Sequence, residues 1–415
     1  MRRQALLLAA HAVEQRLNAD HGDGEQTHLP CSCGQLARYA GRRSKSFQSI
    51  LGPLQLERAY YHCIACGHGF FPRDQQLGLQ ETSLSPAVTR MIAIVGAMVS
   101  FEEGGELLRE LAGVAVDTKQ VERTAESLGA EIAADEKQDV EPVADPTLPP
   151  TIYLGLDGTG VPMRASELVG RPGKQADGSS KTREVKICTV WSAESHDADG
   201  RPVRDEGSVT YSAAIESAAT ADTDEVSSEF TQRVLRESTR RRCTEADRMV
   251  VIGDGAPWIW NIAQELFPRA TQIVDRFHVK AHLSDVAKDL YGAKSQQAKD
   301  WAQRRHDELD AGRLADLLRA LRRHASSNDE VRKCFNYVHR NRHRMNYPLF
   351  QQQGFCTSSG VVEAGCKVAI GCRLKRAGMH WTVRGSDAII ALRCSKLSGR
   401  FQDFWERRSD RRKAA

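Results

Sequence analysis

Three acidic residues occupy positions at which carboxylates could bind a divalent cation. Asp157 directly follows the apolar run IYLGL, and Asp254 directly follows MVVIG. Each is followed by glycine, and α/β sheets place their ligand sites at the carboxyl ends of strands. Glu363 lies in SGVVEAGCK, at the predicted start of a helix. Carboxylate oxygens suit Mg²⁺, and two such ions can promote phosphodiester chemistry, so the three acids predict a metal-dependent site.

Each of these acids also has a structural explanation when it is taken alone. Asp157 and Asp254 could be turn residues, and GLDGTG could be a short glycine-rich phosphate loop. Glu363 could be an acid favoured by the helix macrodipole. The order of the three segments along the chain, rather than any one of them, favours a shared site.

Two close pairs of cysteines predict a second kind of metal site. The pairs are Cys31-x-Cys33 and Cys63-x-x-Cys66, joined by strand-like runs. Four thiolates in this layout are typical of a zinc ribbon with a structural Zn²⁺. The first pair is one residue closer than usual, so a histidine could replace Cys31. Free thiols or disulfides are the alternative. A reducing compartment disfavours the disulfides. The histidines in question are His28, His62 and His68.

A helical stretch follows the cysteines. Residues 99–128 predict a helix, a turn and a second helix. In a helix-turn-helix that binds DNA, the second helix would present Lys119, Gln120 and Arg123. A helical hairpin with no DNA role shows the same pattern, so both interpretations stay open here.

The rest of the chain predicts a mixed-sheet α/β domain with a helical interruption. Strand-like runs at 151–163, 185–193 and 207–213 follow one another closely, and strands and helices then alternate to about residue 290. Three strands in succession before the alternation indicate a mixed rather than a doubly wound parallel sheet. Residues 291–345 are polar and helical in pattern, which predicts an α-helical insertion.

Composition and charge narrow the class of protein. Of the 415 residues, 40% are hydrophobic and 27% are charged. No apolar run approaches the roughly 18 uncharged residues that span a bilayer, which excludes a membrane protein. The first twenty residues predict an amphipathic helix rather than a signal peptide. Residues 371–415 hold 12 Lys or Arg and four acids, a balance of +8, so with a net charge of +4 the remainder carries 4 − 8 = −4. Such an end could attract DNA phosphates or be simply solvated.

The order and the residues of these segments resemble those of the DDE-type transposases of bacterial insertion sequences, most closely the ISKra type. The stretches that carry the resemblance are LGLDGTGVPM, VVIGDGAPWIWN and, as the most specific, residues 337–393. The element DRFHVKAH also resembles the Asp-x-x-His element of Mutator-related transposases. The resemblance covers nearly the whole chain.

This resemblance implies an RNase H-like catalytic core and a role for particular residues. Asp157, Asp254 and Glu363 would be the catalytic acids that bind Mg²⁺ or Mn²⁺. Asp275 and His278 would form an auxiliary site, although a core role for His278 is as well supported by its sequence context. Arg373 and Lys375, shortly after the third acid, would contact phosphates.

The predicted architecture is a multidomain α/β protein with five parts. An N-terminal helix and zinc-ribbon-like module spans 1–80, and a helix-turn-helix-like module spans 84–140. An RNase H-like mixed-sheet core takes up 150–290 and 346–415, the latter with the basic tail, around the helical insertion 291–345.

The predicted function is metal-dependent cleavage and strand transfer at the ends of an insertion sequence. The resemblance implies double-stranded DNA as partner, both terminal repeats and target, and a homo-oligomeric synaptic complex in the bacterial cytoplasm at the nucleoid, with no membrane. An RNase H-like nuclease without strand transfer and a DNA-binding regulator derived from a transposase are the alternatives.

Overall fold

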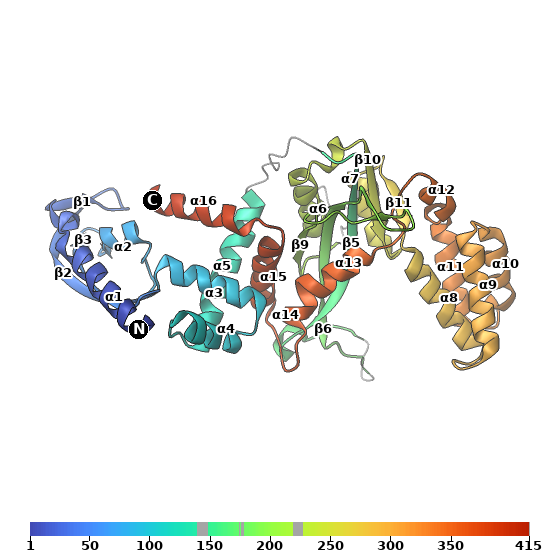
Figure 1. The fold of residues 1–415 in the computed structure, drawn as a ribbon, viewed down its shortest axis with the longest axis horizontal. Helices are drawn as coiled ribbons and strands as arrows, with labels where there is room; N and C mark the ends of the chain where they lie inside the picture. The colour runs from blue at the N-terminus through green and yellow to red at the C-terminus, as the bar shows by residue number, and fades with distance from the viewer. Residues whose placement is uncertain (139–147, 174, 176–177, 219–226, 415) are drawn as a thin grey trace. The chain divides into compact units, whose positions relative to one another are not determined.

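The computed structural model describes residues 1–138, 148–173, 175, 178–218 and 227–414, and the chain forms two compact units (Figure 1). One unit contains residues 1–135 and 399–415, and the other contains residues 136–398. The boundary predicted between the module that ends at residue 140 and the core that begins at residue 150 lies mostly outside the described residues. No helix in the described part of the chain is long and apolar enough to cross a membrane.

The first unit begins with a helix that covers a small antiparallel sheet. Helix α1 (Arg2–Ala19) precedes strands β1 (His28–Pro30), β2 (Leu36–Ser49), β3 (Gly52–His62) and β4 (Gly69–Phe70), which pair in that order. Side-chain oxygens of Glu14 and Asn18 on α1 each accept a hydrogen bond, at 2.8 Å, from the backbone N–H groups of Gln55 and Glu57 in β3. The helix thereby satisfies part of an otherwise open strand edge.

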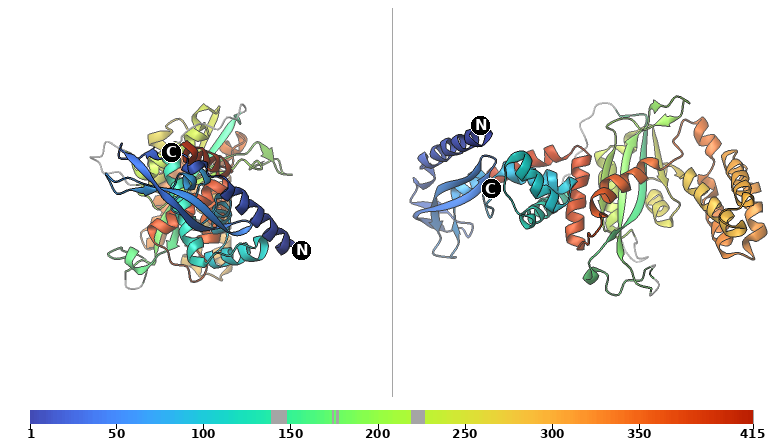
Figure 2. Two further views of the ribbon diagram at one scale, coloured as in Figure 1. Left: turned by 90° about the vertical axis from the view of Figure 1, so that its left-hand side faces the viewer. Right: turned by 60° about the horizontal axis from the view of Figure 1, so that its bottom comes forward.

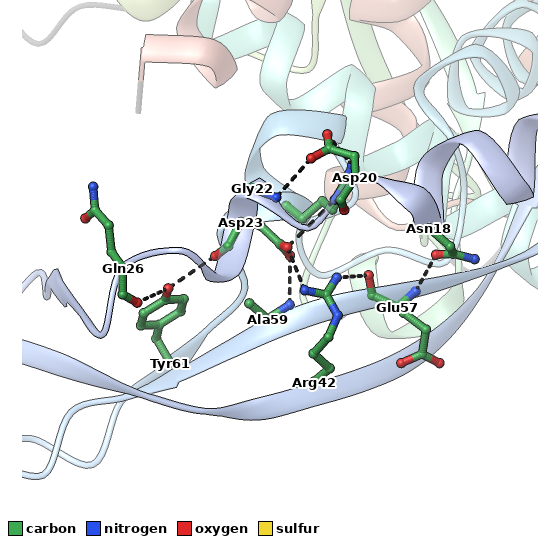
Figure 3. A network of polar contacts seen from close by, with 10 residues as sticks. Asn18, Asp20, Gly22, Asp23, Gln26, Arg42, Glu57, Ala59 and Tyr61 are labelled. Atoms are coloured by element: carbon green, nitrogen blue, oxygen red, sulfur yellow. Dashed lines mark hydrogen bonds and ion pairs between the residues drawn. The ribbon is translucent and has the colours of Figure 1, made fainter.

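A buried acid ties the chain after α1 to this sheet (Figure 3). Asp23 lies in a short 3-10 turn, η1 (Gly22–Gly24), and is 8% exposed. Its carboxylate accepts hydrogen bonds from Arg42 at 2.9 Å and from the backbone N–H of Ala59 at 2.7 Å. The Tyr61 hydroxyl donates to the backbone carbonyl of Gln26 at 2.6 Å. The network fixes the segment that leads into β1, at whose end the first cysteine pair begins.

The remainder of the first unit is helical. It comprises α2 (Pro72–Leu77), α3 (Pro86–Met98), α4 (Phe101–Leu107), the π-helical turn η2 (Leu108–Ala112), most of α5 (Thr118–Gln138) and α16 (Phe401–Ala414). Val88, Ile92 and Val121 are buried at its centre. The arginines of α16 are largely engaged: Arg407 and Arg411 each lie 2.7 Å from carboxylate oxygens of Asp135, and Arg408 bonds Glu131.

The second unit contains a five-stranded sheet in the order β11-β10-β5-β6-β9. The long strands β5 (Thr151–Pro162) and β6 (Thr182–Ser192) run antiparallel along their whole length, as the green arrows in Figure 2 show. Strands β10 (Arg248–Gly253) and β11 (Thr271–Val274) run parallel to β5, and β9 (Thr210–Ala214) is antiparallel to β6. The prediction of a multidomain, mixed-sheet α/β fold is therefore confirmed.

Helices pack against this sheet around a large apolar core. They include α6 (Glu229–Arg240), α7 (Pro257–Leu266) and, later in the chain, α13 (Gly360–Gly365), η6 (Cys366–Gly371), α14 (Cys372–Leu374) and α15 (Val383–Leu397). The sheet's apolar runs supply buried residues such as Tyr153, Trp191 and Val251. Small pairs of strands and turns complete the unit: η3 (Ala165–Glu167), β7 (Ser195–His196), β8 (Pro202–Val203) and η4 (Cys243–Glu245).

A bundle of helices extends from the end of the sheet, drawn in yellow to orange in Figure 1. It comprises α8 (Arg276–Tyr291), α9 (Gln296–Asp310), α10 (Leu314–Ala325) and α11 (Asp329–Asn341), followed by η5 (Arg342–Arg344) and α12 (Tyr347–Gln352). Residues 291–345, all of them described, contain no strand. Leu309, Leu317 and Val331 lie in its interior, contiguous with the core under the sheet.

Candidate functional site

Two of the predicted acids lie side by side where the parallel pairing of β5 with β10 ends. Strand β10 ends at Gly253, directly before Asp254, whereas β5 continues past Asp157 to Pro162 in its pairing with β6, so the prediction that Asp157 marks a strand end was wrong. The parallel register pairs Ile252 of β10 with Gly155 of β5. Two residues further along each strand, the same register places Asp254 opposite Asp157. The charge of Asp254 raises the pKa of Asp157, after burial as the main cause. The sheet thus brings together two carboxylates that are distant in sequence.

The third predicted acid reaches the same edge from helix α13. Glu363 lies in the first turn of this helix, and its pKa is raised by burial first and then by the charges of Asp275 and Asp157. Helix α13 packs very close to β5: a Cβ added at Gly155 would lie 2.0 Å from the side chain of Val362. Gly155 therefore permits the close approach that brings Glu363 to the site.

The three carboxylates have few partners of their own. One oxygen of Asp157 accepts a hydrogen bond from the backbone N–H of Gly158 at 2.7 Å, and one oxygen of Asp254 accepts from Ala256 at 2.9 Å. No Lys or Arg in the described part of the chain forms an ion pair with Asp157, Asp254 or Glu363. Negative charge therefore accumulates here without an ion pair to Lys or Arg, which suits a bound cation.

Asp275 is held in a structural role beside this site. It follows β11 and lies opposite Asp254 when the register of Gly253 with Val274 is continued by one residue. The residue is 1% exposed, and both carboxylate oxygens are occupied. One accepts from the backbone N–H of His278 at 2.8 Å, as the cap of α8, and the other accepts from the backbone N–H of Ser359. Asp275 thus joins the start of α8 to the segment that carries Glu363.

The ring of His278 lies near the carboxylates and contacts the rings of His282 and Tyr337 in the helical bundle. Its positive form would lower the pKa of both Asp157 and Glu363. Its Nε2 lies 3.0 Å from Nε2 of His282, whose pKa is lowered by burial and then by His278. The predicted auxiliary pair, Asp275 and His278, therefore lies next to the three acids.

Two contacts at the site had no signal in our sequence analysis. The Cys366 thiol donates to the second oxygen of Asp157 at 3.2 Å, and the Tyr337 hydroxyl donates to the backbone carbonyl of Asp254 at 2.7 Å. Cys366 follows Glu363 by three residues, so it lies on nearly the same helix face. Tyr337 comes from α11, 83 residues after Asp254, and only the packing of the helical bundle reveals it.

The two predicted phosphate contacts near Glu363 have different environments. Lys375 is exposed, and its ammonium group donates to the hydroxyl of Thr159, two residues after Asp157. Arg373, by contrast, has no exposed surface and lies 5.2 Å from the ring of Trp381. The expectation that Arg373 contacts a phosphate is corrected by this burial, because the η6–α14 turn directs its side chain into the core.

The residues expected to contact DNA from α5 face outward. Lys119 and Arg123 are exposed and Gln120 is half-buried, while Val121 between them is buried. Lys119 forms an ion pair with Glu122 at 2.7 Å. The helix thus presents one face of its first two turns to solvent, as a DNA-contacting helix would require.

The four predicted zinc ligands converge on one point. Their sulfur atoms all lie within 4.8 Å of one another, with the sulfurs of Cys31 and Cys66, and those of Cys33 and Cys63, each 3.6 Å apart. Tetrahedral Zn²⁺ with bonds of about 2.3 Å requires sulfur atoms about 3.8 Å apart, so the cluster fits zinc. The backbone N–H of Cys33 is the main cause that lowers the pKa of Cys31 to about 6.

Tight turns build this cysteine cluster. Gly34 and Gly67 follow the second cysteine of each pair with φ of +82° and +74°, values that favour glycine. Their backbone N–H groups donate to the carbonyls of Cys31 and Cys63 at 2.9 and 2.8 Å. Cys31 therefore belongs to the cluster, and none of the three alternative histidines does.

The carboxylates are arranged differently from the cysteines. The cysteine cluster is the one group of three or more potential ligands whose atoms all lie within 4.8 Å in the described part of the chain. Sites with two cations spread their ligands over ions roughly 3.5 to 4 Å apart, so their carboxylates need not meet at one point. Oxygen-only donors at the edge of a sheet fit Mg²⁺ or Mn²⁺ rather than zinc.

Comparison with known proteins gives a family and distant structural likenesses. A model of the Uncharacterised protein family (UPF0236) matches residues 172–409, more than half of the chain. This stretch includes Asp254 and Glu363 but not Asp157. The solved structure of a Drosophila P element transposase strand transfer complex is similar at 11% identity, covering 81% of this chain and 84% of that chain, with a TM-score of 0.27. No curated protein matches the chain.

Proposed function

The chain belongs to the Uncharacterised protein family (UPF0236), and from its site we propose that it is a DNA transposase of the DDE type. Asp157, Asp254 and Glu363 would bind Mg²⁺ or Mn²⁺ and carry out cleavage and strand transfer at the ends of an insertion sequence. The resemblance to the ISKra type supports this proposal independently of the family, whose description states no activity.

One observation carries the proposal: three carboxylates from distant segments lie at one sheet edge without an ion pair to Lys or Arg in the described residues. A structural cluster of acids would normally be paired with basic groups, because like charges held close together are unfavourable. A divalent cation would remove this unfavourable charge. The mixed sheet, with three strands in succession before strands and helices alternate, supports an RNase H-like core around these acids.

The surrounding residues would orient the acids and the DNA. Cys366 and the backbone N–H of Gly158 hold the Asp157 carboxylate, and Asp275 holds the segment that carries Glu363. Lys375, exposed beside Thr159, is positioned to contact a DNA phosphate. When bound, two cations would activate the attacking oxygen and stabilise the leaving oxygen in an in-line displacement.

The first unit would recognise the DNA ends. The cysteine cluster would hold a structural Zn²⁺ that fixes the small sheet, and α5 would present Lys119, Gln120 and Arg123 to the terminal repeat. Water would first attack the phosphodiester at the transposon end, and the freed 3′-hydroxyl would then attack target DNA. Two ends must be joined, so a homo-oligomer is part of the proposal.

A cleavage and joining assay tests this function. The substrate is linear DNA containing the sequence that flanks the gene on both sides, incubated with a target plasmid and Mg²⁺ or Mn²⁺. The expected result is metal-dependent cleavage and joining by the wild type and neither by Asp254→Ala.

Other outcomes would assign one of the alternatives. Cleavage without joining, also with pre-cleaved ends, would contradict a transposase and indicate a nuclease. Binding of the flanking DNA without cleavage by either protein would indicate a DNA-binding regulator.

A further inference from the structure

The helical bundle contains a polar cavity that the proposed catalytic site does not use. It has a volume of about 420 Å³ and lies between α8, α9 and α10. This volume falls within the range of about 300 to 1,000 Å³ that is usual for ligand sites. Its lining contains four arginines, three aromatic or imidazole rings, two acids and Ala320; the charged and ring residues are Arg304, Arg305, Arg319, Arg323, Tyr291, Trp301, His324, Glu308 and Asp316.

The base of the cavity is built from buried, mutually satisfied groups. Trp301 is 5% exposed, and the Arg305 guanidinium lies 5.1 Å from the centre of its ring. Arg305 also donates to the Glu308 carboxylate, with its Nε at 2.6 Å. Tyr291, half-buried, contacts the rings of both Trp301 and His324 at centroid distances of 6.4 Å. The charged groups at the base are thus already paired.

The exposed side of the cavity carries an excess of positive charge. Arg319 is paired with Asp316 at 2.7 Å. Arg304 of α9 and Arg323 of α10 are exposed and form no ion pair in the described part of the chain. Four arginines against two acids leave a balance of 4 − 2 = +2 with His324 neutral. Two guanidinium groups without acidic partners, on different helices around one cavity, suit an anion with several oxygens.

We infer that this cavity binds the phosphodiester backbone of DNA, with Arg304 and Arg323 as the phosphate contacts and Tyr291 and His324 as the wall beside the sugar and base. This site was not among the DNA contacts predicted from the sequence. Arginines without acidic partners contact DNA phosphates without reading the base sequence, so this cavity suits a duplex of any sequence.

The inference rests on the proposed function in one respect, namely the distance between the cavity and the carboxylates that would cleave the DNA. Helix α8 begins directly after Asp275, beside those carboxylates, and ends at Tyr291 in the cavity wall. Its 16 residues span about 24 Å. At about 3.4 Å per nucleotide, DNA held in the cavity would be contacted roughly seven nucleotides from the scissile phosphate.

A DNA-binding measurement tests the inference. The full chain is titrated against a labelled 40-base-pair duplex of arbitrary sequence, and the equilibrium affinity is measured at a series of salt concentrations. The pocket variant is Arg304→Ala with Arg323→Ala. The matched control is Arg332→Ala with Arg340→Ala, which removes the same charge from exposed positions of α11 outside the cavity. For two lost phosphate contacts, the slope of log K against log salt should fall by about 2 in the pocket variant, with affinity about tenfold or more weaker. The control should keep the wild-type slope.

Equal losses in both variants, an unchanged slope in the pocket variant, or no duplex binding by the wild type would each overturn the inference. The measurement requires no cleavage, so it separates this site from the proposed catalysis. If the wild type neither cleaves nor joins DNA but the slopes of the pocket and control variants differ as predicted, the cavity remains a DNA site and the proposed transposase function is rejected. If the wild type cleaves and joins DNA but the slopes of the two variants do not differ, the transposase function remains and the cavity is rejected as a DNA site.

Discussion

The cysteine cluster and the carboxylate site are assembled in opposite ways. The cysteines come from two tight turns, and glycines with positive φ fold each turn so that all four sulfurs lie within 4.8 Å. The acids come from the middle of one strand, the end of its neighbour and a helix, and their placement depends on the register of the sheet and the packing of α13. A local site is determined by short spacing, whereas a site at a sheet edge depends on the whole second unit.

The two sites also differ in the sequence separation of the contacts that support them. The cysteine turns are held by their own backbone hydrogen bonds. The carboxylate site requires contacts across long stretches of sequence, such as Asp275 with Ser359, Cys366 with Asp157, and Tyr337 with Asp254. We therefore expect changes at these supporting residues to affect activity more than stability.

The largest effect should come from the acids themselves. Asp254→Asn or Asp157→Asn should reduce metal-dependent DNA cleavage at least about 100-fold, because bound metal contributes several kcal/mol to phosphodiester chemistry. Asp300→Asn, at an exposed position of α9, is the matched control and should retain wild-type rates. Rates that remain within threefold of wild type in both active-site variants would place the catalytic metal elsewhere.

Loss of a cysteine should act on the first unit instead. Cys66→Ser should lower bound zinc from one ion per chain to none and destabilise that unit by several kcal/mol, because structural zinc contributes to folding free energy. Elemental analysis and thermal unfolding measure both effects. Cys372→Ser, at an exposed cysteine outside the cluster, should change neither. Zinc that stays at one ion per chain in Cys66→Ser would refute the ribbon.

Asp275→Asn should have an intermediate effect. The amide offers one acceptor where the native carboxylate accepts from both His278 and Ser359, so one buried N–H loses its partner. We expect roughly a tenfold lower cleavage rate and a higher Mn²⁺ concentration for half-maximal activity, since Glu363 is less well positioned. A loss as large as that of Asp254→Asn would instead make Asp275 a direct metal ligand.

The smallest effect should follow Tyr337→Phe. This change removes one hydrogen bond to the backbone carbonyl of Asp254, worth about 1 kcal/mol, and keeps the ring that packs against Gly255. Cleavage should slow by about fivefold. Phe335→Leu on the same helix serves as the control. An unchanged rate in Tyr337→Phe would show that the helical bundle does not position the Asp254 loop.

Much of this arrangement could be predicted from the sequence because it depends on local signals. The strand-like run 151–163 and the apolar run before Asp254 identified β5 and the end of β10, and cysteine spacing identified the cluster. The contacts of Cys366 and Tyr337 could not be predicted, since a thiol and a phenol in helices have no pattern that indicates their partners. The prediction for Arg373 was wrong because a basic residue near a site favours a phosphate contact, whereas the fold buries this side chain beside Trp381.

The most direct test is to locate bound Mn²⁺ by anomalous diffraction from crystals of the full chain soaked with the ion. If the sheet edge is a divalent-cation site, an anomalous peak should lie between the carboxylates of Asp157 and Asp254, within reach of Glu363, and should vanish in Asp254→Asn. Peaks confined to other parts of the molecule, or an identical peak in Asp254→Asn, would contradict the account.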